Sequence, residues 1–122
     1  MQINEKLIKP KKYDITLNTE YLYESDFSVG CFKIGNLAFV SINTIAFKTS
    51  EIPNYSILLS GLPKPKQETI FLLYAYGGTS RDCIRVRVDA SGNIILHWSS
   101  IPNSGNAGNI QYGGTLIYET TD

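Results

Sequence analysis

Thr-Ile-Phe-Leu-Leu-Tyr-Ala-Tyr-Gly-Gly-Thr-Ser-Arg-Asp-Cys-Ile-Arg-Val-Arg-Val-Asp-Ala-Ser-Gly-Asn-Ile-Ile-Leu-His-Trp, from Thr69 to Trp98, is the stretch of sequence that decides the fold. It contains three apolar runs separated by two segments that contain glycine. Short apolar runs bounded by glycine-bearing turns are typical of β-strands. The stretch therefore predicts three consecutive strands, and the rest of the chain has to cover their apolar face.

The middle run has the period of a strand with one buried face. Apolar residues of this run are expected inward and charged residues outward: Ile84, Val86 and Val88 inward, Arg85, Arg87 and Asp89 outward. The segment that follows, Asp89-Ala-Ser-Gly-Asn93, has the composition of a tight hairpin turn, in which Gly92 is free to take a positive φ. The third run then places Ile94, Leu96 and Trp98 on one face of a strand.

Two segments are apolar on both faces: Leu37 to Ile42, and the first run of the opening stretch, Ile70 to Tyr76. A strand with two apolar faces is buried at the centre of a fold or lies in a subunit interface. The pattern is compatible with either position.

Turn signals divide the remaining chain into further short strands. The segments expected to form them are Tyr13 to Tyr23, Phe27 to Ile34, Leu37 to Phe47, Ser56 to Leu59 and Gly114 to Glu119. No segment predicts a helix. Eight or nine short strands predict an all-β fold, an antiparallel β-sandwich of jelly-roll-like type. Residues 1–12, which are polar and rich in lysine, are expected to be an N-terminal arm or linker, and residues 13–122 a single β-sandwich domain.

Composition narrows the classes of partner. Eleven basic and eleven acidic residues balance to a net charge of zero, so we expect no nucleic-acid partner. The first residues lack the apolar stretch of a signal peptide. No segment has the ~20 consecutive apolar residues of a membrane helix, so we expect no membrane insertion. Cys31 and Cys83 both fall in expected strands; free thiols and a bridge between them are both open.

The sequence contains few residues that are suited to catalysis. His97 is the only histidine. A serine–histidine–aspartate arrangement would combine it with Ser99, Ser100 or Ser104 and with Asp82 or Asp89, but no motif supports such a group. His97, Cys31 and Cys83 lack the spacing of zinc ligands. We therefore predict no catalytic residue, no metal and no cofactor.

The loop that follows the third run contains residues that are suited to bind a ligand. Its asparagines lie between two aromatic residues, and the candidate ligand-binding residues are Trp98, Asn103, Asn106, Asn109 and Tyr112. Amides can bind the hydroxyl groups of a sugar, and a flat ring can cover the apolar face of a pyranose. The alternative is that Trp98 packs in the core and that the loop only connects two strands.

The order of several short motifs resembles a known family. These motifs are Cys31-Phe-Lys-Ile-Gly-Asn-Leu-Ala-Phe-Val-Ser-Ile42, Gly61-Leu-Pro63, Arg85-Val-Arg-Val-Asp-Ala-Ser-Gly-Asn-Ile94 and Tyr112-Gly-Gly-Thr-Leu-Ile-Tyr118. Together they resemble the C-terminal β-sandwich modules of phage tail-fibre and baseplate receptor-binding proteins and of related prophage structural proteins. The likeness covers most of residues 20–120.

The resemblance implies a non-enzymatic module that binds a host-surface saccharide or another tail protein. It also implies a homotrimer, located in the phage tail or made from a prophage in the bacterial cytoplasm. Three other readings stay open: a structural module that joins tail parts, a secreted bacterial carbohydrate-binding module, and a small hydrolase of cell-surface polymer.

Overall fold

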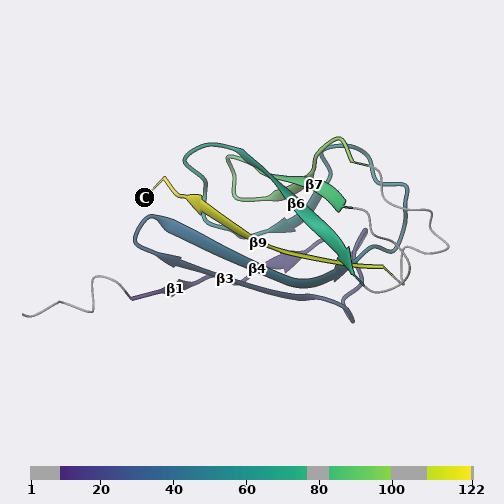
Figure 1. The fold of residues 1–122 in the computed structure, drawn as a ribbon, viewed down its shortest axis with the longest axis horizontal. Helices are drawn as coiled ribbons and strands as arrows, with labels where there is room; N and C mark the ends of the chain where they lie inside the picture. Colours follow the sequence, from purple (N-terminus) through teal and green to yellow (C-terminus); the bar gives the residue numbers. More distant parts are fainter. Residues whose placement is uncertain (1–8, 77–82, 100–109, 122) are drawn as a thin grey trace, which may run out of the picture.

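The chain folds as one antiparallel β-sheet that curls into a half-barrel (Figure 1). The computed structural model describes residues 9–76, 83–99 and 110–121. Within these ranges no helix is long and apolar enough to cross a membrane. The strands in them are β1 (Lys11–Lys12), β2 (Thr16–Leu17), β3 (Ser28–Ile34), β4 (Leu37–Ala46), β5 (Ile57–Ser60), β6 (Thr69–Tyr76), β7 (Cys83–Val88), β8 (Ile94–Leu96) and β9 (Gln111–Glu119).

The strand order across the sheet is β1-β3-β4-β9-β6-β7-β8-β5-β2. The last strand of the chain, β9, lies between β4 and β6 and pairs with both in antiparallel orientation. The prediction of an antiparallel all-β fold is confirmed. The two sheets of a jelly-roll-like sandwich are not confirmed, because hydrogen bonds join every named strand into one continuous sheet.

The meander predicted from the opening stretch is present as β6, β7 and β8. The inward face of β7 is as expected, since Ile84, Val86 and Val88 are at most 1% exposed. In the turn that follows, Gly92 takes a φ of 81°. The Asp89 carboxylate accepts hydrogen bonds from the backbone N–H groups of Ser91 and Asn93, which fixes the turn from inside.

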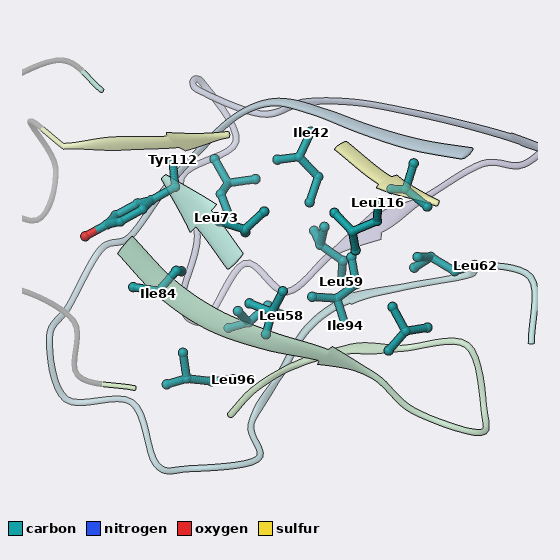
Figure 2. Packing of buried hydrophobic residues seen from close by; sticks show 14 of the residues in the cluster. Ile42, Leu58, Leu59, Leu62, Leu73, Ile84, Ile94, Leu96, Tyr112 and Leu116 are labelled. Atoms are coloured by element: carbon teal, nitrogen blue, oxygen red, sulfur yellow. The ribbon is translucent and has the colours of Figure 1, made fainter. Parts of the chain in front are cut away.

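The core lies on the inner side of the curl. Figure 2 shows Ile42 and Leu116 on one side of it and Ile84 and Leu96 on the other. Burial of these side chains removes apolar surface from water and is the main force that closes the sheet on itself. The largest fully buried side chains of the core are Tyr112, Phe47, Leu22, Ile45, Leu58, Leu59, Leu73, Ile84, Ile94, Leu96, Leu116 and Val40.

The strand expected over Tyr13 to Tyr23 is shorter than predicted, because it ends in a turn at Asn18. The Asn18 carbonyl accepts hydrogen bonds from the N–H groups of Tyr21 and Leu22, so the chain turns away and only Thr16–Leu17 pairs with β5. The expected linker also contributes to the sheet, since Lys11–Lys12 pairs with β3. Residues 1–8 lie outside the described residues.

Both cysteines are free thiols on different strands, β3 and β7. Cys83 is exposed, whereas Cys31 is buried in the core. Burial raises the pKa of the Cys31 thiol to about 11, because a thiolate would lose its hydration there. Burial also raises the pKa of the Tyr118 hydroxyl, and nearby Cys31 and Tyr13 add to that rise.

We expect the free energy of unfolding to fall as the pH rises above the ordinary pKa of a thiol. The unfolded chain then releases the Cys31 proton while the folded chain still holds it, so the stability is complete below that pKa and decreases until the pH reaches about 11. The loss should be about 2 kcal/mol from this thiol. Urea unfolding between pH 7 and pH 11 measures it. Cys31→Ala should remove most of the decline below pH 10, the ordinary pKa of the Tyr118 hydroxyl, and Cys83→Ala should not. Equal slopes in the two variants below pH 10 would contradict the assignment.

Candidate functional site

Two aromatic side chains stand together on the surface beside the end of β8. Trp98 is 63% exposed and Tyr55 is 45% exposed. Their ring centroids lie 5.6 Å apart and the ring planes make an angle of 78°, an edge-to-face arrangement. The two rings therefore form an exposed aromatic pair, which we call the Tyr55–Trp98 pair.

The backbone at both residues has an uncommon conformation. The φ angles are 68° at Tyr55 and 45° at Trp98, a region that bulky side chains rarely occupy. Hydrogen bonds hold it: the Trp98 N–H donates to Asn54 Oδ1 at 2.5 Å, and the Trp98 carbonyl accepts from Arg85 Nη2 at 2.6 Å. Backbone outliers of this kind concentrate at functional sites, where surrounding contacts compensate for their cost.

Arg87 lies next to the aromatic pair because of the sheet register. On the outer face, Arg87 is opposite Ile95, and Ile95 is opposite Ile57, two residues after Tyr55. The guanidinium carbon of Arg87 is 5.2 Å from the centre of the Tyr55 ring, within the range of a cation–π contact. Its Nε is 4.0 Å from a carboxylate oxygen of Glu68, so the guanidinium is close to both an aromatic ring and a carboxylate.

His97 and Asn54 complete the polar surroundings. The His97 ring centre is 5.9 Å from that of Tyr55. Asn54 Nδ2, Arg87 Nε and His97 Nδ1 are buried and make no hydrogen bond to other described residues. Exposed aromatic faces with amide, imidazole and guanidinium groups at their edge are suited to bind a ligand that has apolar faces and hydroxyl groups.

The structure places Trp98 where a ligand can reach it, but not on the predicted face. Trp98 was expected on the same face as Ile94 and Leu96, which are both buried. That prediction is wrong, because β8 ends at Leu96 and the positive φ of Trp98 turns its side chain outward. The alternative in which Trp98 packs in the core is wrong for the same reason.

The other predicted ligand-binding residues do not join Trp98 in the described structure. Tyr112 is 1% exposed and its ring packs edge-on against Phe47 at 5.5 Å, so it offers no open face to a ligand. Asn103, Asn106 and Asn109 lie outside the described residues.

Sequence reasoning missed Tyr55 and Asn54 as partners of Trp98. The three residues meet because β5 pairs with β8, and because the Tyr55 N–H donates to the Leu96 carbonyl at 2.9 Å. No local pattern announces such a long-range pairing. Only the outward position of Arg87 could be found from the sequence, through the alternation of β7.

The Asp89 carboxylate, one candidate for a catalytic triad with His97, is engaged with the N–H groups of its own turn. Asp82, the other candidate, lies outside the described residues. Across residues 9–76, 83–99 and 110–121, no three His, Cys, Asp or Glu side chains gather where they could hold a metal ion.

Comparison with protein-family models gives no match for this sequence, and comparison with curated proteins gives none either. Functional inference therefore starts from the residues of this chain.

Proposed function

We propose that the chain is a non-enzymatic module that binds saccharides, with the Tyr55–Trp98 pair as the surface on which a sugar ring lies. The observation that carries this proposal is the exposure of both rings at positions where the backbone is held in an uncommon conformation. The faces of aromatic rings suit the apolar C–H faces of pyranoses, and their rigidity lowers the entropic cost of binding.

Polar groups beside the pair can form hydrogen bonds with the hydroxyl groups of a sugar, which sugar recognition also requires. Sugar hydroxyls both donate and accept hydrogen bonds, so a binding site needs groups of both kinds at the edge of the aromatic surface. Arg87 is partly exposed there, at 28% of its side chain, and Glu68 adds a carboxylate within 4.0 Å of it. The arrangement favours a ligand that covers Trp98 and directs hydroxyl groups toward Arg87.

The sequence resemblance suggests the biological setting. We propose that the saccharide belongs to a host cell surface and that the chain acts in a phage tail or baseplate, or is made from a prophage in the bacterial cytoplasm. In the same setting we propose a homotrimer. A jelly-roll-like sandwich remains our proposal for the fold family, supported by the way in which β4 and β9 lie across one core from β7 and β8.

Replacement of the exposed tryptophan should abolish most of the binding. We expect Trp98→Ala to weaken the affinity for a host-surface oligosaccharide about 10-fold or more, because the largest apolar contact of the site is lost. Tyr55→Ala should have a smaller effect in the same direction. A glycan array identifies a ligand for the wild-type chain, and titration calorimetry with that oligosaccharide measures the change.

Phe32→Ala is the matched control, because Phe32 is also an exposed aromatic residue on the sheet surface, at 38%. It lies on β3, and β4, β9, β6 and β7 separate it from β8. The control should bind the oligosaccharide as the wild-type chain does. Wild-type affinity in Trp98→Ala, or a similar loss of affinity in Phe32→Ala, would contradict the proposed site.

A further inference from the structure

The outer side of the sheet carries a second exposed feature, separate from the Tyr55–Trp98 pair. Large apolar side chains are 36–59% exposed along three strands of the sheet, β3, β9 and β6. We call this group the apolar outer face, and its members are Phe32, Ile34, Ile70, Leu72, Tyr74, Tyr76 and Ile117.

Strand register places these residues on the same side of neighbouring strands. Phe32 is opposite Phe39 on β4, and their rings stack with centroids 5.1 Å apart. Phe39 is in turn opposite Ile117 on β9. The β6 members follow on the next strand of the sheet, since Tyr74 is opposite Gly113 on β9. A groove of about 360 Å³ lies beside Ile117 and Thr69 and is also lined by the polar side chains of Lys66, Gln67 and Glu119.

The domain does not use these side chains for its own core. On β6, Leu73 points inward and is fully buried, whereas the alternate residues Leu72 and Tyr74 point outward. The hydroxyl of Tyr76 donates to the Asn43 carbonyl on β4, which ties its ring down across the sheet surface. The apolar outer face is thus partly preorganised, which lowers the cost of packing against a partner.

The exposed area is at the upper end of what a monomer presents to water. Taking about 200 Å² for a fully exposed large side chain, the seven residues expose on the order of 600 Å². The largest apolar patch of a typical monomer is about 300–600 Å². A stable protein–protein interface buries about 800 Å² on each partner. The apolar outer face is therefore large enough to supply most of one side of such an interface.

We propose that the apolar outer face packs against a second copy of this chain. None of its seven residues is charged, so the face brings no charge of its own to the centre of a contact with a second copy. The chain has a net charge of zero, so two copies do not repel each other through their net charge. Arg85 on the neighbouring β7 and Glu119 on β9 place both signs of charge beside the face. This is the polar border that interfaces have.

This inference rests on the self-association proposed above and names the surface that joins the copies. It can fail independently of the saccharide site, because neither Tyr55 nor Trp98 belongs to the apolar outer face. Light scattering coupled to size exclusion tests it. The wild-type chain should have a mass of at least twice 13.6 kDa. Leu72→Glu should be a monomer of 13.6 kDa, with self-association weakened at least about 100-fold, because packing would have to remove a charged carboxylate from water in an apolar contact. The variant should still fold, since residue 72 is opposite Arg85 within the same chain.

Ile57→Glu is the matched control. Ile57 is 43% exposed and Leu72 is 42% exposed, and both lie on the outer side of the sheet, but Ile57 is on β5, away from the apolar outer face. The control should keep the wild-type mass. Tyr74→Ser provides a gentler second variant and should also weaken association. A wild-type monomer at the highest concentration reached, an associated Leu72→Glu, or a dissociated Ile57→Glu would each overturn the proposal.

Discussion

Tyr112→Ala should lower the free energy of unfolding by about 3–5 kcal/mol, the range for removing a buried aromatic ring. Tyr112 is 1% exposed and is among the largest fully buried side chains described. Its ring packs edge-on against Phe47, and Figure 2 shows it beside Leu73 and Ile84 in the core. Removal of the ring leaves a cavity that the surrounding strands cannot fill. Urea denaturation followed by circular dichroism measures the loss.

Tyr112→Phe is the control, because it keeps the ring and removes only the hydroxyl group. We expect it to change the free energy of unfolding by less than about 1 kcal/mol and to leave saccharide binding unchanged. The comparison separates the buried position seen in the structure from the ligand-binding role expected from the sequence. If Tyr112→Ala unfolded at the wild-type urea concentration and lost saccharide affinity, the ring would be a binding residue and its position in the core would be contradicted.

Local patterns predicted the parts of the fold that are local in the chain. The alternation over Ile84 to Val88 was sufficient to identify β7 and its inward face, because a strand side chain changes side at every residue. The hairpin at Gly92 was visible for a similar reason, since few residues other than glycine take a positive φ. The position of β9 between β4 and β6 was not predictable, because it depends on pairing between distant segments.

The same difference between local features and long-range pairing explains which residues of the candidate site could be predicted from the sequence. The sequence was sufficient to identify Trp98 as a candidate ligand-binding residue, because an aromatic residue beside a polar loop is a local signal. It could not show that Tyr55 and Arg87 lie around it, since β5, β7 and β8 bring them together. It also did not show that β6 keeps its second apolar face exposed, because the two-sided pattern fits a buried strand equally well.

Gly92→Ala should also be strongly destabilising, for two separate reasons. The φ of 81° is unfavourable for alanine. In addition, a Cβ at this position would lie 2.2 Å from the Leu62 carbonyl oxygen, a backbone atom that cannot rotate away. The Leu62 N–H already donates to the Gly92 carbonyl at 3.0 Å, so the hairpin and the segment after β5 are held together at this point. We expect a loss of about 3 kcal/mol or more in the free energy of unfolding.

Gly35→Ala separates the two reasons. Gly35 has a φ of 59°, but a Cβ there would meet no described atom within 4 Å, so alanine should cost only about 1–2 kcal/mol for the backbone conformation. The excess loss in Gly92→Ala over Gly35→Ala, measured by urea unfolding of both, is then the cost of the clash with Leu62. Equal losses would mean that the hairpin can move away from Leu62. A large excess would establish that the turn after β7 is packed rigidly against the chain after β5. That packing fixes β8, and with it the position at which Trp98 leaves the sheet.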